Sequence, residues 1–226
     1  HALQDQHFDL DREMDWYDES LLAFDSLVEG DATRIEQQYL RSLSPEEQQA
    51  AAAEQAGGAE PPASPSLQVL AMLSGFPYEV GEQFVADVFA AGGQARLDEA
   101  FKSPPTTTEQ LLHPERFLTL EEPVEVQSPE PEGEVYEEGV WGEAGLLTML
   151  LNTIPEEQAW AAADGWAGDY YVAWKRGGQD CVRMSIATDG RADKEELLAA
   201  LRSWAIQHPA VSIRDGRNIN IRACVA

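Results

Sequence analysis

The spacing of apolar residues predicts a long amphipathic helix near the start of the chain. The helix is expected to start at residues 18–20, and from Leu21 to Tyr39 apolar residues recur at steps of three and four, which is the repeat of one helix face. The members of this stripe are Leu21, Phe24, Val28, Ala32, Ile35 and Tyr39. Glu29 lies beside the stripe, and Gly30 follows in mid-helix, where glycine costs about 1 kcal/mol relative to alanine. The close approach of a second helix would explain a glycine at that position.

Other helices are marked by residues typical of helix ends. The segment 44–47 reads Ser-Pro-Glu-Glu, with a serine cap, a proline at the first helical position and acids in the first turn. Residues 79–91 follow a helical pattern that Gly92 and Gly93 end. Helices are also expected over residues 94–101, 142–154 and 155–164, and Thr107 is expected to cap a brief turn.

The pattern changes to that of strands toward the C-terminus. Residues 169–175 and 180–188 read as strands joined by a glycine-rich hairpin turn. An amphipathic helix over 192–207 and a second hairpin follow, which makes a ββαββ unit with a small antiparallel sheet. The acidic, proline-rich segment 121–139 reads as a surface connector, with one edge strand expected over 124–127.

These elements predict an α+β protein dominated by helices. We expect a helical core over residues 1–165 and a small α+β subdomain over residues 166–226. The charge distribution supports this division. Residues 171–226 carry nine of the fifteen lysines and arginines but only six of the forty-one acids, so this segment is +3 and the first 170 residues are −29.

The net charge of −26 limits the classes of partner. Nucleic acids and anionic membrane surfaces are bound by clusters of lysine and arginine, so both are unfavourable partners for this chain. No apolar stretch is long enough to span a bilayer, and we expect no membrane insertion. Cys181 and Cys224 both fall in expected strands, where a structural disulfide and two buried thiols are equally compatible with the pattern.

Five segments in order carry a resemblance to a known family. They read HALQDQHFDL from residue 1, then EGDAT, FPYEVGEQFV, TTTEQLLHPERF and GWAGDYYVAW, ending near residue 176. The chain resembles bacterial, mostly actinobacterial, neutral zinc metallopeptidases of the gluzincin type, whose active-site helix carries H-E-x-x-H. The last segment has Ala167 where the family usually has glycine. The resemblance implies that the helical core is zincin-like.

The resemblance also implies a zinc site. His1 takes the place of the second motif histidine, and Glu29 takes the place of the third protein ligand of Zn²⁺. The first histidine and the general-base glutamate would precede His1. We therefore expect the chain to be the C-terminal part of a longer metallopeptidase, truncated inside its motif and inactive by itself. Its expected substrate is a peptide or protein.

Several other polar residues are weaker candidates. His113 could donate a hydrogen bond to an oxyanion, and it is our one candidate catalytic residue; a hydrogen bond to a neighbouring loop is the alternative. Asp25 and Asp31 could orient a metal ligand by hydrogen bonding to it, without binding the ion themselves. His7 and His208 are expected to have structural roles at helix ends.

Two other classes of function stay open. One is an inactive zincin-derived protein of the cell envelope that binds a partner, and the other is an acidic secreted scaffold. All three interpretations place the protein outside the cell or in the cell envelope.

Overall fold

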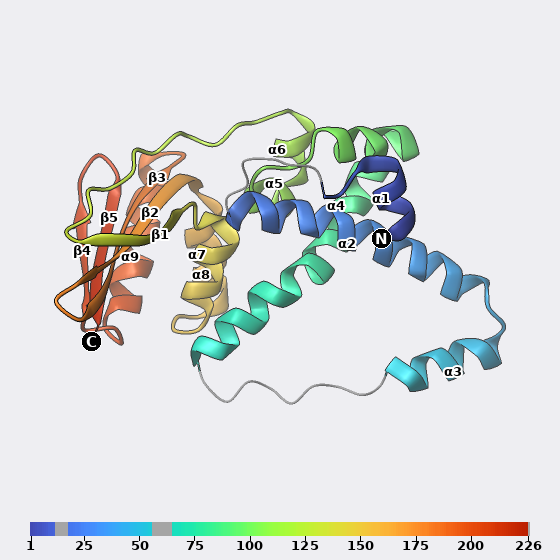
Figure 1. Ribbon diagram of the computed structural model, residues 1–226, viewed down its shortest axis with the longest axis horizontal. Helices are drawn as coiled ribbons and strands as arrows, with labels where there is room; N and C mark the ends of the chain where they lie inside the picture. The colour runs from blue at the N-terminus through green and yellow to red at the C-terminus, as the bar shows by residue number, and fades with distance from the viewer. Residues whose placement is uncertain (12–17, 56–64, 226) are drawn as a thin grey trace. The chain divides into compact units, whose positions relative to one another are not determined.

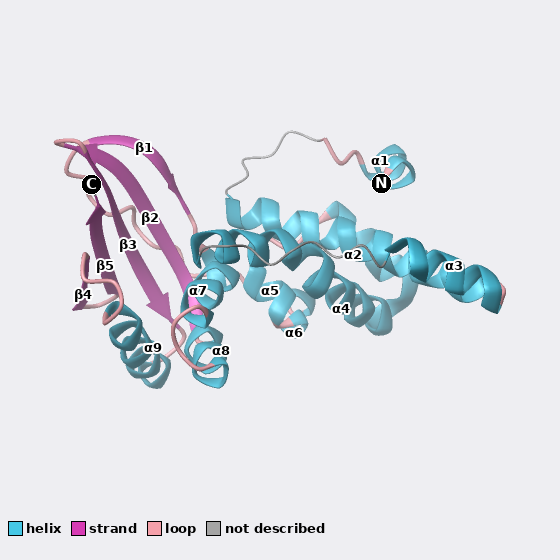
Figure 2. Cartoon of the chain, turned by 90° about the horizontal axis from the view of Figure 1, so that it is seen from below, coloured by secondary structure: helices cyan, strands magenta, loops and turns pink. Residues whose placement is uncertain are grey.

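The computed structural model describes residues 1–11, 18–55 and 65–225 and shows an α+β fold (Figures 1 and 2). The helices are α1 (Ala2–Phe8), α2 (Asp18–Ser42), α3 (Pro45–Gln55), α4 (Pro65–Lys102), α5 (Thr108–Leu112), α6 (Pro114–Leu118), α7 (Gly142–Leu151), α8 (Glu156–Asp164) and α9 (Arg191–Ala205). The strands are β1 (Glu134–Gly139), β2 (Trp166–Arg176), β3 (Gln179–Thr188), β4 (Val211–Asp215) and β5 (Ile219–Val225).

The chain divides into two compact units that are described separately. Unit 1 comprises residues 1–14 and 23–105, and unit 2 comprises residues 15–22 and 106–226. This division differs from the expected boundary at residue 165, which lies inside unit 2.

Unit 1 is built on the packing of α2 with α4. Gly30 of α2 and Gly81 of α4 are so close that a Cβ atom on either would overlap a backbone oxygen of the other helix. The expected reason for a mid-helix glycine is therefore confirmed. The helix over 79–91 is confirmed as well, although it begins earlier, at residue 65, and continues past Gly92 and Gly93 after a kink.

The apolar stripe of α2 is buried over only part of its length. Phe24 and Val28 are 4% and 8% exposed, whereas Ile35 and Tyr39 are 50% and 63% exposed. Periodicity identifies one face of a helix, but it does not show how far along that face a partner packs. The apolar stripe is therefore packed in the middle of α2 and exposed toward its C-terminal end.

Unit 2 contains a five-stranded antiparallel sheet in the order β1-β2-β3-β5-β4. Strands β2, β3, β4 and β5 with helix α9 form the expected ββαββ arrangement, and Gly177 and Gly178 adopt positive φ in the first hairpin. Helices α7, α8 and α9 cover one face of the sheet (Figure 2). The apolar core beneath them contains Leu146, Leu150, Ala159, Trp166, Ile186, Leu197 and Ile219. Because α7 and α8 share this core with the sheet, they fold with the C-terminal strands.

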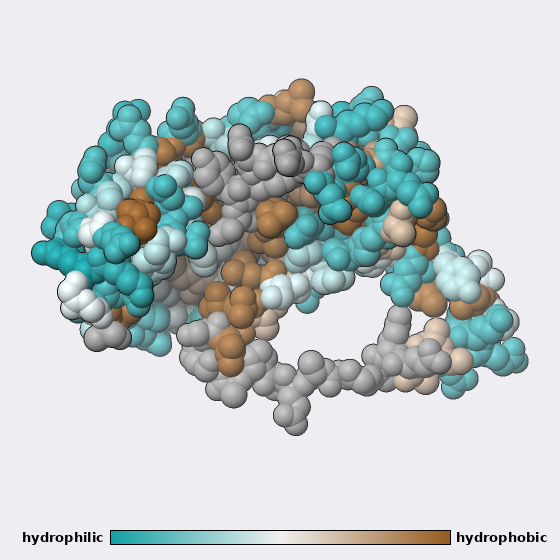
Figure 3. All heavy atoms as spheres, in the orientation of Figure 1, coloured by the Kyte–Doolittle hydropathy of each residue, from teal (hydrophilic) through white to brown (hydrophobic). Residues whose placement is uncertain are grey.

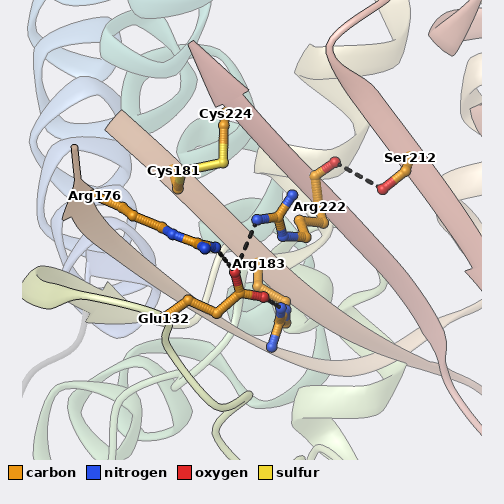
Figure 4. The surroundings of a disulfide bond; sticks show 7 residues. All are labelled: Glu132, Arg176, Cys181, Arg183, Ser212, Arg222 and Cys224. Atoms are coloured by element: carbon orange, nitrogen blue, oxygen red, sulfur yellow. Dashed lines mark hydrogen bonds and ion pairs between the residues drawn. A yellow bond between two sulfur atoms is a disulfide. The ribbon is translucent and has the colours of Figure 1, made fainter. Parts of the chain in front are cut away.

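The opposite face of the sheet carries a disulfide and a cluster of arginines (Figure 4). Cys181 of β3 faces Cys224 of β5, and the two form the disulfide. Arg183 and Arg222, the next pair along these strands on that face, both bind the Glu132 carboxylate, as does Arg176. Glu132 thereby holds the acidic connector against the sheet.

The edge strand of the connector is not where the sequence predicted it. Strand β1 pairs with β2 at residues 134–139, whereas the expected segment 124–127 makes a single backbone bond to β2, from Val124 N to Ala167 O at 2.7 Å. Five of the six β1 residues are exposed and a bulge interrupts its register, so it lacks the alternating pattern by which strands are recognised.

Hydrophilic residues, in teal, are the commonest kind on the face drawn in Figure 3, in keeping with the acidic composition. Within the described ranges, none of the helices combines the length and the apolar character needed to cross a bilayer.

Candidate functional site

Unit 1 brings together the two residues expected to bind zinc. The Nε2 atom of His1 lies 3.2 Å from Oε2 of Glu29. His1 precedes α1, and Glu29 is in the buried middle of α2. The His1 side chain is 53% exposed and that of Glu29 is 25% exposed, so the pair is accessible from solvent.

A chain of hydrogen bonds fixes the orientation of the His1 ring. Its Nδ1 atom is 3.2 Å from Oε1 of Gln4, and the Gln4 amide donates to Oδ2 of Asp31 at 3.1 Å. Arg34 holds the same Asp31 carboxylate with two hydrogen bonds of 3.0 and 2.8 Å to Oδ1. When Nδ1 carries the proton and donates it to Gln4, Nε2 keeps a lone pair directed at Glu29. Asp31 therefore orients His1 through Gln4.

The second oxygen of Glu29 is also engaged. The Tyr78 hydroxyl, from α4, donates to Oε1 of Glu29 at 3.2 Å. The negative charge of Glu29 raises the pKa of Tyr78 above its ordinary value, because the charge disfavours loss of the hydroxyl proton. Burial raises the pKa of Asp25, one turn earlier on α2, and the charge of Glu29 adds to the effect. Asp25 therefore adds negative charge beside Glu29.

Unit 2 holds a second group of residues that could bind a metal ion. His113, Glu143 and Asp164 each offer one ligand atom, and these atoms all lie within 4.8 Å of one another. The His113 Nε2 atom is 3.1 Å from Oε1 of Glu143 and 3.3 Å from Oδ1 of Asp164. Within the part of the chain that the structure describes, this is the one group of three or more such residues.

Local structure explains how these three residues meet. Thr107 caps α5 by accepting a hydrogen bond from Gln110 N, as expected, and α6 begins with Pro114, so His113 occupies the sharp turn between the two helices. Glu143 is in the first turn of α7, and Asp164 is the last residue of α8. Burial raises the pKa of Glu143, while its hydrogen bond to His113 raises the pKa of the imidazole.

Two buried carboxylates fix the starts of α5 and α7. Oε1 of Glu19 accepts hydrogen bonds from the N–H and the hydroxyl of Thr108, at 2.5 and 2.8 Å. Asp169 accepts from the N–H groups of Trp141 and Gly142 at 2.8 and 2.9 Å. Burial raises the pKa of both, that of Glu19 to about 8. Both also line a cavity of about 430 Å³, but because their oxygens cap helices we assign them a structural role.

The remaining candidates are not part of either group. His7 is exposed in the last turn of α1, and the His208 ring stacks on Trp204 just after α9, with ring centroids 4.3 Å apart. No local sequence pattern marks Gln4, Tyr78, Glu143 or Asp164 as site residues. Glu143 lies in a run that reads as an ordinary apolar helix, and Asp164 marks a helix end, so neither carries a local signal of metal binding.

Comparisons with known proteins assign no activity to either group. A family described only as a domain of unknown function, DUF8575, matches residues 132–223. The match includes Glu143 and Asp164 but neither His113 nor the His1–Glu29 pair. The search of curated proteins and the search of solved structures returned no match.

Proposed function

We propose that the protein is a zinc-dependent peptidase in which His1 and Glu29 are two of the protein ligands of the metal. The observation that carries the proposal is the 3.2 Å distance between His1 Nε2 and Glu29 Oε2. Ligand atoms about 2.0–2.2 Å from a tetrahedral Zn²⁺ are separated by roughly 3.3–3.6 Å. The two side chains therefore need little movement to share one ion.

The surroundings of the pair also fit a metal site. Ligand histidines usually donate their second ring N–H to an oxygen acceptor, which fixes the tautomer and the ring plane. Gln4 supplies that acceptor at Nδ1, and Asp31 supports Gln4. Tyr78 holds one oxygen of Glu29 and leaves Oε2 on the side of His1.

The chemistry follows from the ligand set. A bound Zn²⁺ polarises the carbonyl of the scissile peptide and lowers the pKa of a metal-bound water. His1 and Glu29 would hold the ion, Gln4 and Asp31 orient His1, and Tyr78 orients Glu29. By resemblance, the remaining histidine and a glutamate that accepts the water proton would come from a segment before His1. We therefore expect peptide cleavage by a chain that includes those residues.

The metal-binding step can be tested on the 226-residue chain. We would measure Zn²⁺ affinity by competition with a chromophoric chelator, in the His113→Ala background so that the second group does not contribute. Glu29→Gln should weaken Zn²⁺ binding at least tenfold, while Glu82→Gln, an exposed acid of the same unit, should leave it unchanged. The α-amine and imidazole of His1 can chelate zinc without Glu29. Equal affinity in the His113→Ala chain and in the His113→Ala/Glu29→Gln chain would therefore show that Glu29 is not a ligand and would overturn the assignment.

The catalytic step needs the residues before His1. With these present, a quenched fluorescent peptide should be cleaved, and a chelator or Glu29→Gln should abolish cleavage. Zinc binding without cleavage would instead favour the inactive binding protein of the envelope.

A further inference from the structure

The geometry points to a second divalent-metal site in unit 2, formed by His113 Nε2, Glu143 Oε1 and Asp164 Oδ1. This site is independent of His1 and Glu29. It would take a transition-metal ion such as Zn²⁺ or Mn²⁺, because one imidazole nitrogen and two carboxylate oxygens suit these ions. Ca²⁺ prefers a larger set of oxygen ligands alone.

The first argument is the convergence of two carboxylates on one ring nitrogen. The distances from His113 Nε2 are 3.1 Å to Glu143 and 3.3 Å to Asp164. A ring nitrogen carries at most one hydrogen, so it cannot donate a linear hydrogen bond to both oxygens. A cation placed among the three atoms would interact with all of them, and the two distances from Nε2 are close to the roughly 3.3–3.6 Å edges of a tetrahedral site.

The second argument is an oxygen of Glu143 with no hydrogen-bond partner. The Glu143 side chain is 1% exposed, its Oε1 faces His113, and its Oε2 is buried without a protein partner. An unsatisfied buried carboxylate oxygen costs free energy of roughly 1–3 kcal/mol or more. A cation at the Glu143 carboxylate would compensate for this cost.

The third argument is that the fold holds the ligands in place. Glu143 starts α7, where Asp169 binds the backbone N–H groups of Trp141 and Gly142. Helices α7 and α8 then pack on the sheet through one apolar core, which fixes Asp164 relative to Glu143. Asp164 is 67% exposed, so the site opens to solvent on that side and water can complete the coordination.

The assignment gives His113 a role other than the expected one. With Nε2 directed at a metal ion, His113 would not donate a hydrogen bond from that atom to an oxyanion. A bound ion would instead cross-link the α5–α6 turn to the ends of α7 and α8. Metal binding should therefore stabilise unit 2.

The test measures binding of Zn²⁺ and Mn²⁺ by the full chain in the His1→Ala/Glu29→Gln background, which removes both members of the other proposed ligand pair. We expect one ion per chain and a rise in the unfolding temperature that a chelator reverses. His113→Ala and Asp164→Asn should each weaken binding at least tenfold. His208→Ala and Glu157→Gln, which change a histidine and an exposed acid elsewhere in unit 2, should leave it unchanged.

Weaker binding by His113→Ala could also result from misfolding of that variant. Asp164→Asn controls for this, because it alters an exposed side chain and leaves the core intact. Its near-ultraviolet circular dichroism should match that of the parent chain. Equal affinity in the parent, His113→Ala and Asp164→Asn chains would overturn the proposal, as would the absence of metal binding in the parent chain. Tighter binding of Ca²⁺ than of Zn²⁺ and Mn²⁺ would overturn the assigned class of ion.

Discussion

Gly30 and Gly81 bring the backbones of α2 and α4 into direct contact, and a Cβ atom on Gly30 would overlap the Gly81 carbonyl oxygen. The contact lies next to Glu29, so it also determines how close α4 and its Tyr78 hydroxyl come to the carboxylate. Helix packing and the proposed zinc site of unit 1 therefore depend on the same pair of glycines.

Replacement of Gly30 by alanine should destabilise unit 1. The added methyl group would push α2 away from α4, and overpacking of this kind typically costs about 1–3 kcal/mol. Gly75→Ala is the matched control, because a Cβ there would meet nothing closer than the Glu79 side chain at 3.8 Å. That substitution should stabilise α4 by about 0.5–1 kcal/mol. Urea unfolding followed by circular dichroism would compare the two, and a Gly30→Ala chain as stable as the wild type would contradict the packing argument.

Loss of the disulfide should destabilise unit 2. Cys181 and Cys224 are separated by 43 residues, and closing a loop of this length stabilises a fold by about 4 kcal/mol in the chain-entropy model. The Cys181→Ala/Cys224→Ala chain should thus unfold at lower urea concentration, and reductant should change the stability of the wild type alone. Zinc affinity at His1 and Glu29, in the other unit, serves as the control and should not change.

The stability of unit 2 should fall as the pH rises from about 4.5 to about 8, in part because of Glu19. Burial raises the pKa of Glu19 from 4.5 to about 8, so the folded protein keeps a proton that the unfolded chain releases. Stability from this group is complete below pH 4.5 and is lost as the pH rises through the folded pKa. Glu19→Gln imitates the protonated acid and should be more stable than the wild type at pH 8 by about 1 kcal/mol or more, with little difference at pH 4.

The measurement is urea unfolding at several pH values with a chelator present. Glu109, Glu143 and Asp169 also have raised pKa values, so Glu19→Gln should reduce the slope of stability against pH without abolishing it. Glu196→Gln, at an exposed position of α9, should leave the slope as it is. A Glu19→Gln chain with the wild-type slope would show that Glu19 ionises normally in the folded state.

The carboxylate of Glu132 should stabilise the sheet face that carries the arginines. Its hydrogen bonds to Arg183 and Arg222 lower its pKa, so its contribution is present at neutral pH and is lost as the pH falls through the lowered value. Glu132→Gln should lower the unfolding temperature at pH 7, less so at high salt and not at pH 2. Glu134→Gln, two residues further on β1, is the control; equal effects of the two substitutions would exclude a specific role for Glu132.

Local sequence patterns predicted the secondary structure of most of the chain, and the family resemblance suggested one candidate pair of metal ligands. Periodicity and turn residues predicted the ββαββ arrangement, the Thr107 cap and a helix end at Gly92 and Gly93, where the structure has a kink, because these features depend on local backbone preferences. The family resemblance pointed to His1 and Glu29, and the α2 pattern placed Glu29 at the edge of a buried stripe, from which it can reach His1.

Which distant residues meet depends on the tertiary structure. Strand β1 is exposed and carries no alternating pattern, so only its pairing with β2 identifies it. The cysteine pattern allowed both thiols and a disulfide, and the β3–β5 register brings Cys181 opposite Cys224. His113, Glu143 and Asp164 are separated by 30 and 21 positions in sequence and come together because α7 and α8 pack on the sheet. Such convergence depends on long-range packing, which no local pattern encodes.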